Sequence, residues 1–319
     1  MSGDLGIGTD QTVSTLEGDR RALAAVATQF FINGAVVASY VPRLPAIRDR
    51  LDLDLQSIGT ILGLATLGGV IGSVVVGPII RRFGTRRAMA IGSVLLVAAL
   101  PIIGFVSSSV QLAAIIAFIH AADVQTDVAM NLQGSALSAR RPKPVMNRLH
   151  GMWSLGTVVG GVVASIMAGA GVSLQAHLIG ASLVLAVAAV WVIPGLRTDH
   201  DMPPQDVAVG GSSKRGLVIV FAVLGGAAII PEMVNSDWSA FRLVDDLGAS
   251  QSVAGLAFVC FTAGMVVGRF GGDSVVASIG SSRLLVVSTA VTTIGVVVAM
   301  LIPNLATTFV GLFLSLIHI

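Results

Sequence analysis

The sequence has 319 residues, of which 54% are hydrophobic and only 11% are charged, and its mean hydropathy is +0.89. A composition this apolar excludes a water-soluble globular domain. The formal net charge is +2, and the charged residues cluster between long neutral stretches. The small excess of basic residues is therefore attributed to membrane topology, and no nucleic-acid partner is expected.

The neutral stretches are long enough to cross a bilayer, whose hydrocarbon core requires about 20 residues of helix. In hydrocarbon every backbone amide needs an internal partner, so these stretches are expected to be helices. The expected fold class is an all-α integral membrane protein. The predicted spans cover residues 22–41, 57–80, 88–107, 112–135, 151–171, 175–194, 217–236, 252–271 and 284–302, followed by one that begins near 305.

The distribution of basic residues predicts the orientation. With the N-terminus inside, most of the 19 Lys and Arg residues fall in cytoplasmic segments. The external side holds only Arg43, Arg48, Arg50 and Arg242. This asymmetry follows the positive-inside rule. We therefore expect a multi-pass protein of the bacterial inner (plasma) membrane with a cytoplasmic N-terminus.

One long polar segment, rich in Pro, Gly and Ser, divides the sequence. It predicts four regions: a cytoplasmic tail at 1–20, a six-helix bundle at 21–194, a cytoplasmic linker at 195–216 and a partial second bundle at 217–319. The second bundle would hold only spans seven to ten. Relative to two equal halves, the protein is therefore expected to be truncated at its C-terminus.

The two regions repeat one another at an offset of 196 residues (255 minus 59). Gly59, Gly72 and Gly84 recur as Gly255, Gly268 and Gly280, and Arg87 recurs as Arg283. An apolar protein with two similar halves is typical of a secondary transporter, in which the substrate site lies between the halves near mid-membrane.

The loop between the second and third spans, Gly77-Pro78-Ile79-Ile80-Arg81-Arg82-Phe83-Gly84-Thr85-Arg86-Arg87, resembles the loop signature Gly-x-x-x-Asp-Arg-x-Gly-Arg-Arg of the major facilitator superfamily. Arg81 departs from it, because the family usually has Asp there. The second half has a copy that retains an acid, Asp273, before Gly280. The resemblance implies a gating loop formed by Gly77, Arg81, Arg82, Gly84, Arg86, Arg87, Asp273 and Gly280.

The resemblance also implies a transporter bundle of two six-helix halves, the second incomplete, with about 10 of 12 helices present. Residues 122–134 and 147–156, together with Asp237-Trp238-Ser239, are similar to a poorly characterised bacterial branch related to sugar permeases of the fucose type. The fourth span lacks the Arg motif and the fifth lacks the Gly-Pro pair of drug–proton antiporters, which disfavours multidrug efflux.

The fourth span carries the most specific polar constellation. His120, Asp123, Asp127 and Asn131 are three or four residues apart and so share one helical stripe. Carboxylates within a membrane helix are costly and normally face a bundle interior or a wet cavity. Burial disfavours the charged form of a carboxyl, so such groups could exchange protons. Alternatively, the acids pair with neighbouring helices and hold the bundle together.

Other candidates lie in the first and seventh spans. Gln29, Asn33 and Tyr40 of the first span could hydrogen-bond a substrate or an adjacent helix. Glu232 would be the second half's counterpart of the span-four acids if it faces the cavity, whereas Asp237 at the interface would need only hydration. Trp238 is either a stacking platform for a sugar or an interfacial anchor.

These features predict a secondary active transporter for a small organic solute, working by alternating access and coupled to protons, with symport as the expected mode. A drug or metabolite efflux antiporter and a non-transporting sensor are the alternatives. No phosphate-binding loop or zinc motif occurs, so no enzyme activity, cofactor or metal is expected. The expected partners are protons, the lipid bilayer and a neutral or cationic solute, because the predicted transport path is rich in acids and Arg269, near the end of the eighth span, is counted as cytoplasmic. The protein is expected to be a monomer.

Overall fold

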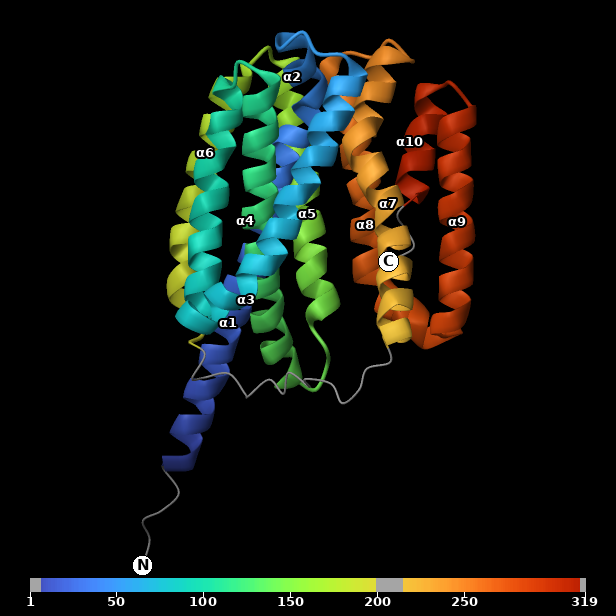
Figure 1. Cartoon of the computed structure of the whole chain (residues 1–319). Coiled ribbons are helices and arrows are strands. Elements are labelled where there is room, and N and C mark those ends of the chain that lie inside the picture. Colours follow the sequence, from blue (N-terminus) through green and yellow to red (C-terminus); the bar gives the residue numbers. More distant parts are fainter. Residues whose placement is uncertain (1–6, 199–214, 316–319) are drawn as a thin grey trace, which may run out of the picture.

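The computed structural model describes residues 7–198 and 215–315, and all its regular elements are helices. The ends of the predicted tail and of the last span, 1–6 and 316–319, lie outside the described residues, as does 199–214 of the predicted linker (Figure 1). The elements are α1 (Ile7–Tyr40), η1 (Val41–Arg43), α2 (Leu44–Arg50), α3 (Leu55–Ala99), η2 (Leu100–Phe105), α4 (Ser109–Ala139), α5 (Met146–Gly169), α6 (Leu174–Val192), η3 (Ile193–Gly195), α7 (Arg215–Asp245), α8 (Gln251–Ile279), α9 (Ser281–Leu301) and α10 (Leu305–Leu314).

Within the described ranges, seven helices are long and apolar enough to cross a membrane. One of these stretches, Leu55–Phe105, covers two predicted spans. The seventh predicted span lies in α7, several of whose side chains are outside the description, and the tenth corresponds to the shorter α10. The expectation of an all-helical integral membrane protein is confirmed.

The chain folds back within α3 at Gly84. A straight helix of 51 residues would measure about 75 Å, more than twice the bilayer core. Gly84 has φ 78° and ψ 165°, a conformation that only glycine adopts readily. The return is fixed at the far end, where the guanidinium of Arg50 donates to the carbonyls of Gly104, Ile103 and Val106.

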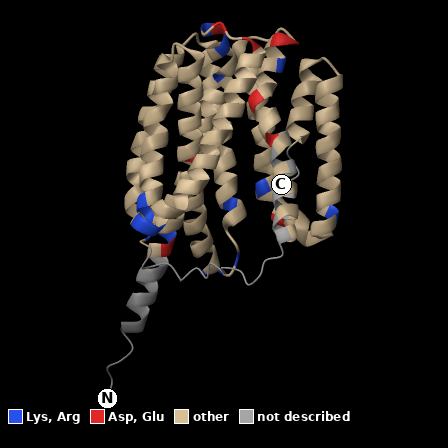
Figure 2. Cartoon of the chain, viewed as in Figure 1, with Lys and Arg blue, Asp and Glu red and all other residues tan. Residues whose placement is uncertain are grey.

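The lipid-facing surface is apolar, and most of the charges gather at the two ends of the bundle, with a few on the helices between them (Figure 2). Val74 and Val184, for example, are each 70% exposed, which is tolerable only where lipid replaces water. We call the ends the linker end, which carries Thr198 and Arg215, and the Arg48 end, which carries α2. In Figure 1 these are the bottom and the top of the bundle.

The sequence repeat has a conformational counterpart at three pairs of positions separated by 196 residues. Gly84 and Gly280 share φ values of 78° and 83°. Asp52 and Gly248 are both left-handed, with φ values of 51° and 64°. Asp54 and Ser250 each cap the N-terminus of the following helix. The side chain of each accepts a hydrogen bond from the backbone N–H three residues later, that of Ser57 or Val253. Hydrogen bonds from Ser57 also lower the pKa of the Asp54 carboxyl.

The two halves meet mainly along α5 and α8, which lie side by side in Figure 1. Gly255 lies against Ser165 near the Arg48 end, Gly161 lies against Phe258 at mid-height, and Gly151 lies against Phe270 toward the linker end. Within the first half, α3 crosses α4 at Gly68. A Cβ there would stand 1.9 Å from the carbonyl oxygen of Ala117. This crossing fixes the position of α4, which carries the acidic stripe.

Candidate functional site

A cavity of about 210 Å³ lies between the two halves. Helices α1, α4 and α5 contribute side chains from one half, and α7 and α8 contribute from the other. It is lined by Val37, Tyr40, Val41, Ile119, His120, Asp123, Trp153, Glu232, Met233, Ser236, Asp237, Phe258, Phe261, Thr262 and Met265. We call it the central cavity.

The α4 stripe presents its acids near mid-membrane. Asp123 lies near the middle of α4 and lines the cavity. Its Oδ1 accepts a hydrogen bond of 2.8 Å from the Nδ2 of Asn33 on α1. Asp127, one turn toward the linker end, accepts a bond of 3.0 Å from Asn131. Of these two acids, only Asp123 lines the central cavity. Asp127 and Asn131 form a separate hydrogen-bonded pair closer to the linker end.

The α7 acids face the same cavity from the opposite half. Hydropathy predicts that the seventh span ends at 236, but α7 continues to Asp245. Glu232 therefore lies near the middle of the helix, not at its outer end. Asp237 also lines the cavity, whereas the sequence left open that it lies at the membrane interface and is simply hydrated. Its Oδ1 accepts a hydrogen bond of 3.4 Å from the hydroxyl of Ser236.

The two polar residues predicted in the first span have different positions. Asn33 is coupled to the cavity through its hydrogen bond to Asp123. Gln29 is absent from the cavity lining, and its Oε1 accepts a bond of 2.8 Å from the hydroxyl of Ser93 on α3. For Gln29, contact with an adjacent helix is therefore the interpretation that the geometry favours.

Two aromatic residues join the acids. The sequence marks Tyr40 as a possible substrate contact but does not mark Trp153 as a cavity residue. Tyr40 lies at the end of α1, lines the cavity, is 2% exposed, and is close enough to Asp123 and Asp237 for electrostatic interaction. Trp153 also lines the cavity, whereas its place at the start of a span suggests a structural residue. No local pattern marks Trp153, because its exposure to the cavity depends on where α8 packs.

Arg269 corrects the expectation that no arginine lies inside the membrane. The predicted topology counts it among cytoplasmic residues, but α8 continues ten residues beyond it, to Ile279. Ten helical residues correspond to about 15 Å. Its guanidinium interacts electrostatically with Glu232 of its own half and with Asp127 of the other half. The absence of an intramembrane cation therefore no longer supports a neutral or cationic solute.

The predicted gating loop is mostly helical. Gly77, Arg81 and Arg82 belong to α3 before the Gly84 turn, and Arg86 and Arg87 follow the turn in the same element. In the second half, Asp273 lies within α8 and Gly280 makes the turn to α9. The carboxylate of Asp273 accepts a hydrogen bond from the Nδ2 of Asn147 on α5, which joins the halves at the linker end.

A second set of contacts joins the halves at the Arg48 end. The Arg48 guanidinium donates to both carboxylate oxygens of Asp245, at 2.5 and 3.0 Å. It also donates to Asp49 at 2.9 Å and lies 5.3 Å from the centroid of the Phe241 ring. Gln251 donates to the other oxygen of Asp49 at 3.2 Å. We call these five residues the Arg48 cluster.

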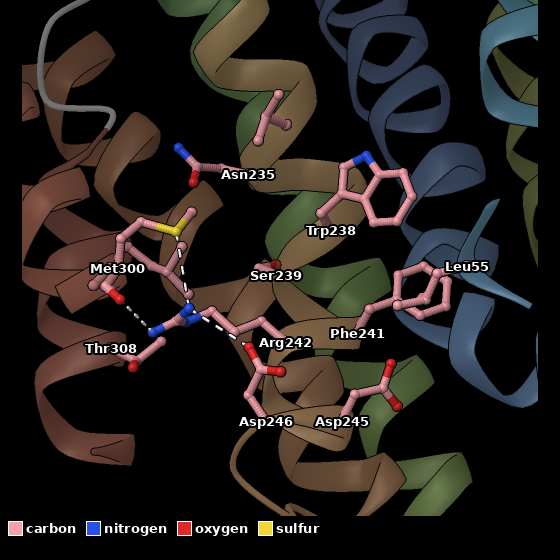
Figure 3. A pocket seen from close by; sticks show the side chains of 13 residues that line it. Leu55, Asn235, Trp238, Ser239, Phe241, Arg242, Asp245, Asp246, Met300 and Thr308 are labelled. Carbon is pink, nitrogen blue, oxygen red and sulfur yellow. Dashed lines mark hydrogen bonds and ion pairs between the residues drawn. The ribbon is translucent and has the colours of Figure 1, made fainter. Parts of the chain in front are cut away.

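A separate pocket of about 220 Å³ lies beside this cluster (Figure 3). Trp238 and Phe241 line one side of it near Leu55. On the other side, Arg242 donates to the carbonyl of Met300 at 2.9 Å and pairs with Asp246 at 3.6 Å. Trp238 thus belongs to this pocket and packs against Gly59, and it is not part of the central cavity lining.

Comparison with known proteins identifies the family. Residues 26–317 match the sequence profile of the Major Facilitator Superfamily. The membrane protein MosC of Rhizobium meliloti is 28% identical over 94% of this chain and 73% of its own length. An uncharacterized MFS-type transporter of Yersinia pestis is 26% identical over 89% of this chain and 74% of its own length.

Solved structures show the same fold. A crystal structure of the nucleoside transporter NupG superposes with a TM-score of 0.66 at 12% identity, covering 92% of this chain and 78% of that one. A bacterial homolog of the human lysosomal transporter Spinster, inward-facing and unoccupied, gives a TM-score of 0.64 at 15% identity, covering 94% and 73%. Together with the profile match over nearly the whole sequence, these findings establish that the protein belongs to the Major Facilitator Superfamily.

Proposed function

We propose that this protein is a secondary active transporter that moves a small organic solute across the bacterial inner membrane by alternating access, in symport with protons. The superfamily consists of membrane transporters and is not an enzyme class. The observation that carries the proposal is the presence of Asp123 from one half and Glu232 and Asp237 from the other in a single cavity between the halves. A site shared by both halves is what a rocking carrier requires.

Proton coupling is supported by the cost of these acids. A carboxylate at membrane depth is expensive unless it is paired or reaches a wet cavity. Burial favours the protonated form, so a group that is alternately buried and wetted binds and releases a proton. Asp127 is the candidate for this step, because it lies beside the lining residues and interacts with Arg269 of the other half.

Alternating access is supported by contacts between the halves at both ends of the bundle. The Arg48 cluster holds one end, and the Asn147–Asp273 hydrogen bond holds the other. We assign the linker end and the N-terminus to the cytoplasm, because the basic loops predict that orientation. We further propose that residues 21–194 and 217–319 are the moving bodies, and that the protein acts as a monomer because both faces of the cavity come from one molecule.

The narrower branch assignment is also a proposal. Residues 122–134 and 147–156 support a place near the fucose-type permeases. Asp123 and Trp153 fall within these stretches and line the cavity. The resemblance therefore concerns the candidate site, not only the loops.

Solute-induced proton flux in proteoliposomes tests the function even while the substrate is unidentified. The full-length protein is reconstituted with a pH-sensitive dye inside, and a panel of metabolites is added outside. A transported solute should acidify the lumen. Asp127→Asn should abolish this signal while exchange of labelled solute partly survives. Normal proton flux and a normal pH dependence in Asp127→Asn would refute the assignment of Asp127.

A further inference from the structure

We propose that the central cavity binds a small organic cation, an amine or quaternary ammonium solute, held between Asp123 and Asp237. The inference rests on the transporter function proposed above and names the substrate class for the same site. It narrows the solute from neutral or cationic to cationic on grounds that the sequence alone did not supply.

The charges around the cavity are the first argument. Arg269 is the one cation that interacts with the described acids of this region, and its interactions are with Glu232 and Asp127. Asp123 and Asp237 have only neutral hydrogen-bond partners among the described side chains, Asn33 and Ser236 respectively. A buried carboxylate without a counter-charge is costly, so a positive ligand at this position would be strongly favoured.

Tyr40 is the second and independent observation. It is 2% exposed and lines the cavity, and its hydroxyl has no hydrogen-bond partner among the described residues. A buried polar group is normally hydrogen-bonded. The Tyr40 ring carries this unpaired hydroxyl within electrostatic range of both Asp123 and Asp237. A ligand that bridges the two acids would therefore lie against Tyr40.

The rest of the lining suits an ammonium group better than a sugar. Phe258 and Phe261 are 2% and 1% exposed, and both line the cavity beside Trp153. Aromatic faces attract cations, by about 2 kcal/mol or more when the contact is desolvated. A neutral polyol would leave the carboxylates of Asp123 and Asp237 without a counter-charge, whereas an ammonium group would supply one.

The size of the cavity limits the solute. Its volume of about 210 Å³ is below the range of roughly 300–1,000 Å³ typical of sites for drug-sized ligands. The proposed solute is therefore compact, of the size of a small amino alcohol or diamine. Because Asp123 and Asp237 belong to different halves, such a cation would be held by both moving bodies at once.

Equilibrium binding to the purified full-length protein tests this inference. Fluorescence of Trp153 is the readout, in a Trp191→Phe/Trp238→Phe background, because Trp153 lines the cavity and the other two tryptophans do not. The probes are pairs of matched size: choline with its uncharged carbon isostere, and putrescine with butanediol. At least one cation should bind ten times or more tightly than its uncharged partner. Equal or weaker binding by both cations would overturn the inference.

Substitutions then locate the site. Asp123→Asn and Asp237→Asn should each weaken cation binding at least tenfold, and Tyr40→Phe should weaken it severalfold. Asp52→Asn is the matched control, because Asp52 is exposed in the turn before α3 and Asn tolerates its positive φ. Cation binding that survives both cavity substitutions would also overturn the inference. Binding needs no gradient, so a loss of transport with intact cation binding would count against the proposed function alone.

Discussion

Replacement of Arg48 by glutamine should open the Arg48 end of the transporter. In the structure this side chain crosses from one half to the other and forms two hydrogen bonds with Asp245, at 2.5 and 3.0 Å. It also lies over the Phe241 ring. Arg48→Gln removes the charge, the bidentate geometry and the ring contact together. No other described side chain hydrogen-bonds to the carboxylate of Asp245.

The free energy lost in Arg48→Gln depends on how far Arg48 and Asp245 are exposed. Hydrogen bonds to charged groups contribute about 1.5–3 kcal/mol when well buried. The side chains of Arg48 and Asp245 are 13% and 27% exposed, which lowers their contribution toward the ~1 kcal/mol of surface pairs. With about 0.5–1 kcal/mol from the ring contact, the total is about 2 kcal/mol. The ratio of open to closed forms should therefore rise about 30-fold.

Cysteine accessibility measures this ratio. Ser236→Cys places a thiol in the central cavity, in a background where the native thiol is removed by Cys260→Ser. A membrane-impermeant maleimide is added from the Arg48 side. The labelling rate should rise tenfold or more in Arg48→Gln.

Arg50→Gln is the control, because among the described residues Arg50 bonds only to carbonyls of its own half, at Ile103, Gly104 and Val106. A double-mutant cycle with Asp245→Asn should be strongly non-additive. An unchanged labelling rate in Arg48→Gln, or an equal rise in Arg50→Gln, would refute the reasoning.

Two further outcomes concern the fold. Gly84→Ala should lower the melting temperature, because φ 78° with ψ 165° costs an L-residue about 1–3 kcal/mol; an unchanged melting temperature would contradict the fold-back at this residue. Gly68→Ala should destabilise by about 1–3 kcal/mol through overpacking against the backbone of α4. Gly63→Ala, with no atom within 4 Å of the added methyl, should leave stability unchanged or raise it, as measured by the same thermal unfolding; equal losses in both variants would contradict the close helix crossing.

Much of the fold could be predicted from hydropathy and spacing. Apolar length alone indicates the helices, and the basic Gly-rich motif places the reversal at Gly84, where glycine is required. The family assignment from this motif and the repeat is confirmed. These features are local, so they can be read from adjacent residues.

The errors concern residues whose role depends on tertiary packing. The ends of α7 and α8 lie within mixed polar sequence, so hydropathy ends the seventh span before Asp237. It ends the eighth span at 271, which leads the predicted topology to count Arg269 as cytoplasmic. Gln29 pairs with Ser93, which is distant in the chain. Trp153 faces the cavity only because α8 packs against α5. The sequence therefore locates the acids and Tyr40 of the candidate site, whereas the roles of Arg269 and Trp153 emerge only from the packing.

The contacts at the two ends of the bundle should depend on one conformational equilibrium of the two halves, and not on two loops that open independently. They lie at opposite ends of the α5–α8 contact, which has Gly161 against Phe258 near its middle. If the halves rock about this region, an opening at one end closes the other. Asp273→Asn removes the charged acceptor for Asn147 at the linker end. A loss of about 1 kcal/mol corresponds to about a fivefold shift.

Labelling of the same cavity thiol should then rise about fivefold from the linker side and fall by a similar factor from the Arg48 side. Arg48→Gln should produce the opposite pair of changes, and the double variant should return the ratio toward that of the parent protein. Local loops would behave differently, because each substitution would raise labelling from its own side and leave the other side unaltered. That result would show that the two contacts do not belong to one rocking motion.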